Sequence, residues 1–435
     1  MNIRTIVKRV IPRRAFAAVE PLGHLGEAVL LNTINGFPAK GLKVIGVTGT
    51  NGKTTTSFLI HRMLHEAGYK VGMMTTVAYG AGLDIRPQMT HMTTASVPVM
   101  MKRIKELKAK GVEWLVLETT SHALAQHRVW GVPYSIAVMT NLTHEHLAYH
   151  GTFDKYVNAK RLMFKQTNAN HAGMRLGIIN ADDPSAAKFA SDIDNSITYG
   201  VEGGNVRAHD IKLSPDGVQY KAELDGTTYD IKTSLAGSFN VYNTLAAVGV
   251  GHALGLSKQQ IEQGIAALDS VEGRMTNIEE GQDFGLIVDY AHSPDSFEKL
   301  FKDLRPVVKG KLIVLFGSLG GGDVPKRSLQ GKLAGTYADE VIVTEEDNRH
   351  EDPNVIFGQI ADGAEQAGKV MDKNVFIVPD RLEAIRFALG RAKKGDTVLL
   401  LGKGHEKTIE RATETIKWNE IATARKLVKA KLAKK

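Results

Sequence analysis

The stretch GVTGTNGKTTT at residues 46–56, which follows the apolar run at residues 42–45, constrains the fold of this chain more than any other feature. A buried strand, a glycine-rich loop and a helix that begins with Lys-Thr form the usual arrangement for binding phosphates. Glycines let backbone N–H groups turn towards phosphate oxygens, the lysine neutralises the outer phosphates, and the threonine hydroxyl can ligate magnesium. A chance Gly-Lys-Thr in a turn is the alternative, which the strand–loop–helix context disfavours. We predict a nucleotide site with Thr54 as a magnesium ligand. Its loop residues are Gly49, Thr50, Asn51, Gly52, Lys53, Thr54 and Thr55.

The loop departs from the strict G-x-x-x-x-G-K-[ST] pattern because Val47 stands where the first glycine belongs. We interpret Val47 as the end of the strand, so that the phosphate-binding unit is the shorter run from Gly49 to Thr54. A loop of this length points away from the ordinary nucleotide triphosphatases.

Apolar runs alternate with helical segments along most of the chain, which predicts an α/β fold. In the first series we expect strands at 42–49, 113–120, 134–142 and 175–184, and helices at 54–69 and 96–111. Residues 197–235 alternate with period two and predict an antiparallel flap on that mostly parallel sheet. A second series has expected strands at 284–290, 311–317, 340–346, 374–379 and 396–402.

A chain of 435 residues is too long for one core. We therefore expect a short basic segment at 1–40, a P-loop-type central domain at 41–272 and a smaller Rossmann-like α/β domain at 273–435. The boundary lies near residues 269–275.

Composition excludes several classes of protein. The chain has no cysteine, so it can form no disulfide, thiolate zinc site or cysteine nucleophile. It shows no apolar stretch long enough to span a bilayer and no signal peptide, and we expect a cytoplasmic monomer. The net charge is +8, but residues 1–19 and 421–435 hold five and six basic residues and no acid, which leaves −3 for the rest. A basic stripe on the folded body is typical of nucleic-acid binding, so we expect no nucleic-acid partner.

The basic amino terminus has two possible interpretations. Ile3, Ile6, Val7 and Val10 recur at helical spacing before Pro12. Residues 1–15 could form an amphipathic anchor with weak contact to an anionic membrane surface, or a helix that packs its apolar stripe on the domain.

Polar side chains follow two other strands of the first series. Glu118 ends one apolar run, and Asn141, Glu145 and His146 follow the next. The carboxyl ends of parallel strands meet at one edge of a sheet, where ligands bind. A carboxylate and an imidazole there suit a second magnesium ion, whereas the alternative is that Glu118 caps the following helix. Lys160 lies on an amphipathic helix and, by its chemistry alone, would be a surface lysine.

The second series also has polar strand ends. They carry Asp289 and His292, a glycine-rich loop with Lys326 and Arg327, the run TEEDNRHEDP at 344–353 and the run LGKGHEKT at 401–408. Four polar strand ends in one domain predict one wall of a ligand cleft, opposite the phosphate loop.

Together these motifs resemble the Mur ligase family, over about residues 43 to 420 and in order. The closest resemblance is to the branch that adds the third peptide residue to a muramoyl dipeptide. The resemblance rests on TGTNGKTTT, MTT, ETTSHALAQHRV, TNLTHEHLAYHG, AKRLMF, NADD, GSFNVYN, EGRM, VDYAHSPDS, KRS, DNRHEDP and GKGHE. It implies that a substrate carboxylate attacks the γ-phosphate of ATP, and that an amino acid's amine then attacks the acyl phosphate.

The resemblance also implies roles for individual residues. Lys53, Glu118, His146 and Lys160 would be catalytic, with Lys160 carbamylated and two magnesium ions held by Thr54, Glu118 and His146. Further ATP contacts would come from Asn240, Arg274 and Asp289. The muramoyl-peptide acceptor would contact Thr93, Thr94, Thr120, Gln126 and Arg128. The incoming free amino acid would contact Arg327, Asp347, Asn348, Arg349, Gly402 and Glu406.

Three departures from the family pattern bear on the substrates. Only 48 residues precede Gly49, fewer than the family's UDP-binding domain needs, so a lipid-linked or other carrier is an alternative. The family's D-H-L-D-Y-H-G has Glu145 and Ala148 in place of its two aspartates. The D-N-P-R signature becomes residues 346–349, where the acids at 345–347 favour a basic amino acid and Arg349 favours diaminopimelate over lysine.

Two rival functions remain open at this point. One is the same ligase chemistry on a folate-type or cyanophycin-type acceptor. The other is a nucleotide-binding relative that has lost catalysis, which the retained Lys53, Glu118, His146 and Lys160 disfavour.

Overall fold

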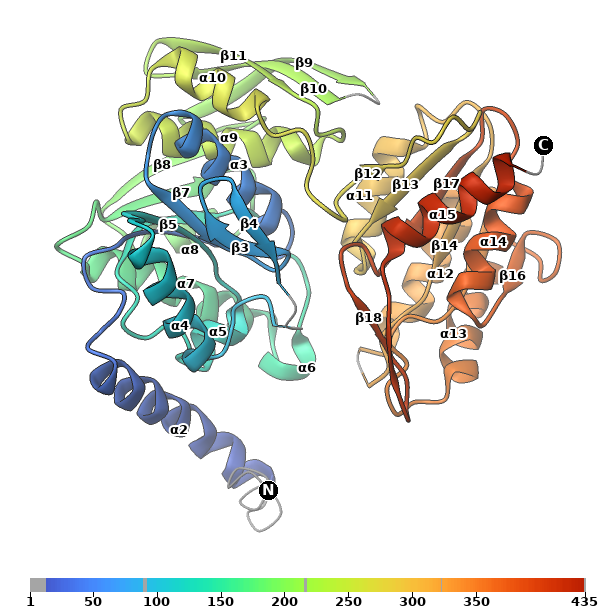
Figure 1. Ribbon diagram of the computed structural model, residues 1–435, viewed down its shortest axis with the longest axis horizontal. Helices are drawn as coiled ribbons and strands as arrows, with labels where there is room; N and C mark the ends of the chain where they lie inside the picture. Colours follow the sequence, from blue (N-terminus) through green and yellow to red (C-terminus); the bar gives the residue numbers. More distant parts are fainter. Residues whose placement is uncertain (1–12, 89–91, 215–216, 322, 434–435) are drawn as a thin grey trace.

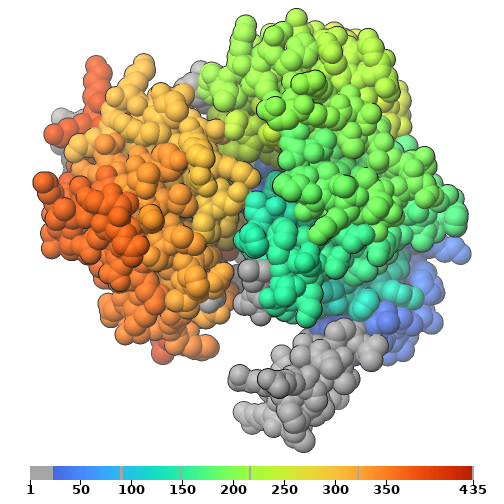
Figure 2. Space-filling view, turned by 180° about the vertical axis from the view of Figure 1, so that it is seen from behind, coloured from blue at the N-terminus to red at the C-terminus, as the bar shows by residue number. Residues whose placement is uncertain are grey.

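The computed structural model describes residues 13–88, 92–214, 217–321 and 323–433, and it contains two large sheets with helices on both faces of each (Figure 1). The eleven-stranded sheet has the order β11-β10-β9-β8-β7-β6-β1-β5-β2-β3-β4. The six-stranded sheet has the order β12-β13-β17-β14-β15-β16. Seen from behind, the yellow-to-red part and the green-to-blue part lie side by side along a seam (Figure 2).

The centre of the larger sheet is parallel, as the sequence predicts. Its parallel strands are β1 (Lys43–Thr48), β2 (Val71–Met74), β5 (Trp114–Glu118), β6 (Tyr134–Met139), β7 (Leu176–Asn180) and β8 (Asn195–Gly200). β3 (Ala78–Ala81) and β4 (Asp84–Pro87) add an antiparallel edge that the sequence analysis missed. These strands are only four residues long, too short to show a clear period.

Residues 197–235 were expected to form an antiparallel flap on the sheet, and this expectation is only partly right. β8 is a parallel strand within the sheet, and β9 (Val206–Ser214), β10 (Gly217–Leu224) and β11 (Thr227–Thr233) continue the sheet at its edge. Alternate residues of β10 are buried. The alternation reflects one face that packs on α9 (Phe239–Ala253) and α10 (Lys258–Ala266).

Helices cover both faces of this sheet, because its buried strands are apolar throughout. α3 (Lys53–Glu66) packs with α9 and α10 on one face. The other face is covered by α4 (Val97–Ala109), α5 (Ser121–Ala125), α7 (Phe153–Ala169) and α8 (Ala186–Ala190). α6 (Leu147–His150) is a single turn that leads into α7.

The smaller sheet contains all five strands expected in the second series. They are β13 (Gly285–Asp289), β14 (Leu312–Phe316), β15 (Glu340–Val343), β16 (Val375–Ile377) and β17 (Thr397–Leu401), with β12 (Thr276–Asn277) antiparallel at the edge. One face packs on α11 (Pro294–Leu304), α12 (Pro325–Tyr337) and α13 (Pro353–Gln366). The other packs on α14 (Arg381–Arg391) and α15 (Glu420–Leu432). β18 (Thr408–Glu410) and β19 (Thr415–Lys417) form a separate two-stranded ribbon.

The long helix α2 (Arg13–Ile34) precedes β1 and projects from the central sheet (Figure 1). Ala28 on this helix is buried against Val97 and Met101. Helix α2 was not predicted from the sequence, because Pro21, Gly23 and Gly26 are poor helix formers. The amphipathic pattern expected at residues 3–10, the basis of the membrane-contact alternative for 1–15, lies outside the described residues. Among the helices that the structure does describe, none is long and apolar enough to cross a bilayer.

A buried ion pair joins the two helices on one face of the smaller sheet. Arg381 at the start of α14 donates to both carboxylate oxygens of Glu420 at 2.7–3.1 Å, and both side chains are fully buried. Arg381 also donates to the carbonyl of Leu401 at 2.7 Å, which ties the pair to the end of β17.

We predict that Arg381→Ala lowers the free energy of unfolding by about 3–5 kcal/mol, because it leaves the Glu420 carboxylate buried without a cationic partner. Urea denaturation measures the change. The matched control is Arg386→Ala on the same helix, which removes an exposed pair with Glu383 and is expected to cost about 0–1 kcal/mol. Equal losses in the two variants would contradict the interpretation.

Candidate functional site

The phosphate loop begins where β1 ends, between the ends of its two parallel neighbours. Val47 lies opposite Glu118 of β5 and Val138 of β6. The loop packs too closely to admit side chains at its glycines. A Cβ on Gly49 would lie 1.9 Å from Thr140 Oγ1, and one on Gly52, whose φ is 80°, would lie 2.3 Å from Asn243 Oδ1.

The end of β6 holds this loop in place, as the polar strand ends predicted. The Asn51 amide donates to Asn141 Oδ1 at 3.0 Å, and Thr140 Oγ1 donates to the Asn51 carbonyl at 2.6 Å. The hydroxyls of Thr50 and Tyr156 lie 2.8 Å apart, which ties the loop to α7. The loop is therefore fixed before any ligand binds.

The carboxylate of Glu118 accepts several hydrogen bonds within the site. Its carboxylate oxygens accept from Thr54 Oγ1 at 3.1 Å and from the Thr76 amide and hydroxyl at 2.8 and 2.9 Å. It does not cap the following helix, because Thr120 does so by accepting from the Ala123 amide at 3.2 Å. A hydroxyl and a carboxylate in contact are the oxygen donors that magnesium prefers, so Thr54 and Glu118 fit that ion. Thr76 was not foreseen, because β2 before it was not expected.

Two lysines lie against the loop, of which Lys160 is buried and Lys53 is partly buried. Lys53 Nζ donates to the Thr50 carbonyl at 2.7 Å, and Lys160 Nζ donates to the Gly49 carbonyl at 2.6 Å. Lys160 is 2% exposed, so the surface interpretation of this residue is wrong. Burial, followed by the charge of Lys53, holds the pKa of Lys160 well below its ordinary value. Burial also lowers the pKa of Lys53, although Glu118 and Glu145 act in the opposite direction.

His146 lies beside Glu145 rather than on Glu118. Its Nε2 is 3.7 Å from the Glu145 carboxylate, and 44% of its side chain is exposed. Desolvation lowers the pKa of His146 to about 4; Glu145 opposes this shift, and Lys160 and Lys53 add to it. The imidazole is therefore neutral near pH 7 and keeps a lone pair for a metal. Within the described ranges, however, no three His, Asp or Glu side chains are grouped to hold a metal ion.

Three of the residues predicted to contact the acceptor lie together beside Glu118. Thr94 Oγ1 donates to the Glu118 carbonyl at 3.0 Å and lies 3.3 Å from Thr120 Oγ1. Arg128 Nη1 donates to the Thr94 carbonyl, and burial lowers the pKa of Arg128 to about 10. Its buried Nε has no hydrogen-bond partner. Thr93 and Gln126, adjacent to this group in the chain, are both partly exposed.

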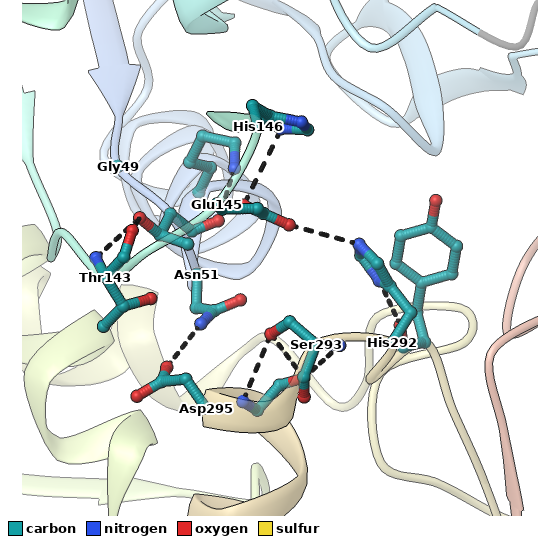
Figure 3. Close-up of polar contacts among 12 residues, drawn as sticks. Gly49, Asn51, Thr143, Glu145, His146, His292, Ser293 and Asp295 are labelled. Atoms are coloured by element: carbon teal, nitrogen blue, oxygen red, sulfur yellow. Dashed lines mark hydrogen bonds and ion pairs between the residues drawn. The ribbon is translucent and has the colours of Figure 1, made fainter. Parts of the chain in front are cut away.

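Residues from segments next to the smaller sheet reach the phosphate loop across the seam (Figure 3). Asn51 Nδ2 donates to Asp295 Oδ2 at 2.8 Å, and His292 Nε2 lies 3.4 Å from Glu145 Oε1. Arg274 Nη2 donates to Thr54 Oγ1 at 3.3 Å. The sequence analysis had placed Arg274 at ATP but had not identified Asp295.

Glu145 has a low pKa because of two histidines, His292 across the seam and His146 next to it in the chain. Burial by itself would raise the pKa of Glu145, but the hydrogen bond from His292 and the charge of His146 outweigh burial and hold the pKa below the usual range. The extra methylene that distinguishes Glu145 from the family's aspartate extends its reach across the seam.

Asn240 and Asp289 are both held by contacts within their own domains. Asn240 Oδ1 accepts from Asn243 at 2.8 Å, and Asn243 in turn accepts from Thr56 at 3.2 Å, so α9 supports α3. The Asp289 carboxylate accepts hydrogen bonds from the backbone amides of Met275 and Ala291, both at 2.7 Å, and burial raises the pKa of Asp289. These contacts give both side chains a supporting position in the structure.

The residues predicted for the amino acid divide into two sets. Asn348 and Arg349 line an open cavity of about 500 Å³, and the Asn348 Oδ1 atom has no hydrogen-bond partner. The other set is held in internal contacts. Arg327 is fully buried and forms an ion pair with Glu351 at 2.6 Å. Asp347 and Glu406 both accept hydrogen bonds from Lys403. Gly402 is packed so closely that a Cβ there would lie 2.5 Å from Glu346 Oε2.

Family models match both parts of the chain. The Mur ligase middle domain matches residues 47–251, and the Mur ligase glutamate ligase domain matches residues 273–404. The chain is 39% identical to a UDP-N-acetylmuramyl-tripeptide synthetase of Roseiflexus sp. (strain RS-1), over 93% of this chain and 82% of that protein. It is 38% identical to a UDP-N-acetylmuramoyl-L-alanyl-D-glutamate–2,6-diaminopimelate ligase of Geobacillus thermodenitrificans (strain NG80-2), over 98% and 87%.

Solved structures share the fold. A UDP-N-acetylmuramoyl-L-alanyl-D-glutamate–2,6-diaminopimelate ligase aligns at a TM-score of 0.63 and 29% identity, over 95% of this chain and 83% of that one. The MurF ligase of Thermotoga maritima, solved in complex with ADP, aligns at a TM-score of 0.68 and 20% identity, over 94% and 84%.

We predict that Gly52→Ala weakens ADP binding at least about tenfold, because the new Cβ collides with Asn243 at the loop. Isothermal titration calorimetry measures the affinity. Gly68→Ala is the control, since Gly68 also has a positive φ, of 87°, but has open space around it. Both variants carry the left-handed backbone cost of about 1–2 kcal/mol, so only Gly52→Ala is expected to lose nucleotide affinity. Equal affinities would contradict the assignment of this loop.

Proposed function

The chain belongs to the Mur ligase family, and we propose that it joins an amino acid, diaminopimelate or lysine, to a muramoyl-dipeptide acceptor in cytoplasmic peptidoglycan synthesis. As a member of that family it is an ATP-dependent, ADP-forming ligase. The observation that carries the proposal is the pair of lysines, Lys53 and Lys160, that donate to carbonyls of a phosphate loop adjoining the Thr94–Thr120–Arg128 group.

The reaction begins with the attack of one anion on another. An oxygen of the acceptor carboxylate attacks the γ-phosphorus of ATP, the bond to the bridging oxygen breaks, and ADP leaves. Carboxylate and triphosphate repel each other, so the site must supply positive charge. Lys53 and Arg274 supply it at Thr50 and Thr54. Magnesium, when held by Thr54 and Glu118, would neutralise further phosphate charge.

The second half of the reaction forms the amide. The uncharged amine attacks the acyl phosphate carbonyl, the tetrahedral intermediate collapses, phosphate leaves with the former carboxylate oxygen, and the nitrogen loses a proton. Arg128, whose Nε is unpartnered, is suited to hold an anionic part of the acceptor. The contacts of Asn51 with Asp295 and of Glu145 with His292 would bring the amino acid close to the acyl phosphate.

A phosphate-release assay tests the proposed function. It pairs UDP-linked and lipid-linked muramoyl dipeptides with diaminopimelate, lysine and a panel of other amino acids. We expect release that depends on both substrates. Release only with folate-type or cyanophycin-type acceptors would favour that branch of the family, and no release with any pair would favour a non-catalytic relative.

A low pKa makes Lys160 a candidate for carbamylation, because the neutral amine is the form that reacts with carbon dioxide. The product would be a carboxylate able to help position magnesium near the loop. We predict a protein carbamate resonance in ¹³C NMR after equilibration with ¹³C-bicarbonate. We further predict that Lys160→Ala removes both this signal and activity, which excess bicarbonate does not restore.

Lys165→Ala is the matched control, since Lys165 lies on the same helix but is 57% exposed. It should keep the carbamate signal and the activity. A Lys160→Ala variant that remains fully active would show that the carbamate assignment is wrong.

A further inference from the structure

The cavity that contains Asn348 and Arg349 has a second guanidinium, from Arg411 in the turn of the β18–β19 ribbon. This residue lies outside every motif that carries the family resemblance. Arg411 donates from Nε and Nη2 to the two carboxylate oxygens of Glu345 at 2.8 and 2.6 Å. About a third of its side chain is exposed, and it lines the cavity.

Arg411 changes the charge that the cavity presents. The acids at 345–347 had suggested a basic amino acid, but Arg411 neutralises Glu345 and Lys403 neutralises Asp347 at 2.8 Å. Burial raises the pKa of Glu346, which lowers its tendency to carry charge. The acidic run is therefore largely compensated within the protein and cannot be counted as a site for an ammonium group.

Arg349, in contrast, is available to a ligand. Its side chain is 48% exposed and pairs with Glu410 at 3.2 Å. Exposed pairs of this kind contribute little to stability, so a substrate carboxylate can replace Glu410 at little cost. Two other acids line the cavity. Glu351 is bound by Arg327, and Asp380, which caps α14, lies 3.6 Å from Arg411.

Two ion pairs join the loop after β15 to the β18–β19 ribbon. Arg349 on the loop after β15 binds Glu410 on the ribbon, and Arg411 on the ribbon binds Glu345 at the start of that loop. The Glu410 amide also donates to Asp347 Oδ1 at 2.8 Å. The two guanidiniums thus line one cavity from two segments that are held together by ion pairs.

We propose that Arg411 is a specificity-determining residue: by neutralising Glu345 beside Arg349, it favours an amino acid whose side chain ends in a carboxylate as well as an ammonium over one that ends in an ammonium alone. The inference rests on the proposed ligase function and assigns to that pocket a residue the family motifs do not include. Without Arg411, the Glu345 carboxylate faces the cavity uncompensated, repels a distal carboxylate and attracts a distal ammonium.

The test is the ratio of kcat/KM for meso-diaminopimelate to kcat/KM for L-lysine, measured by phosphate release with one muramoyl-dipeptide acceptor. We expect Arg411→Gln to lower this ratio about tenfold or more, as loss of a bidentate charge pair would. Arg411→Lys, which keeps the charge, should retain more of the wild-type ratio. The double variant Arg411→Gln/Glu345→Gln should return towards it, and Arg386→Gln, an exposed arginine on α14, should leave it unchanged.

A merely structural role would lower both kcat/KM values alike, and an unchanged ratio in Arg411→Gln would overturn the inference. Glu345→Gln alone provides a second test that leaves Arg411 in place, and it should raise the ratio. A wild-type protein that releases phosphate with neither amino acid would instead contradict the proposed function. A wild-type protein that is active while its variants keep the same ratio would contradict the role of Arg411 alone.

Discussion

The parallel pairing of β1 with β5 on one side and with β6 on the other is the constraint on which the site depends. It brings three strand ends to one edge of the sheet. The phosphate loop, Glu118 and the residues from Asn141 to His146 therefore lie close together, although they are far apart in the chain. Glu118 then binds Thr54 and Thr76, and Asn141 holds Asn51. These contacts join the ends of β5 and β6 to the loop, to the start of α3 and to Thr76 after β2, which leaves the loop little freedom to move.

Two lysines beside the loop, Lys160 buried and Lys53 partly buried, determine the chemistry of this edge of the sheet. Lys53 and Lys160 are both hydrogen-bonded to carbonyls of the loop, and burial lowers the pKa of each. An ammonium group out of water is costly unless an anion compensates it. A triphosphate at the loop would compensate Lys53, whereas conversion to a carbamate would turn Lys160 from a second cation into an anion. Lys53 can thus act as a cation beside the phosphates, while a carbamylated Lys160 would act as an anion close to it.

The strand series and the phosphate loop were predictable because long apolar runs and glycine spacing are local signals. The five strands of the smaller sheet and the convergence of Glu118 and Asn141 on the loop followed from them. Lys160 was misjudged on its chemistry alone, since its burial depends on Gly49, which is 111 residues away in the chain. Asp295 and Arg411 were missed for the same reason, since each acts through a tertiary contact that no spacing encodes, and Thr76 was missed because β2 was not expected.

The central claim is that ATP here activates a carboxylate, and oxygen transfer tests it most directly. The acceptor is supplied with both oxygens of its reacting carboxylate labelled with ¹⁸O, and the inorganic phosphate released in the presence of the amino acid is analysed by mass spectrometry. Passage through an acyl phosphate predicts one ¹⁸O atom in each phosphate and one in the new amide. Unlabelled phosphate, released together with product, would contradict the account.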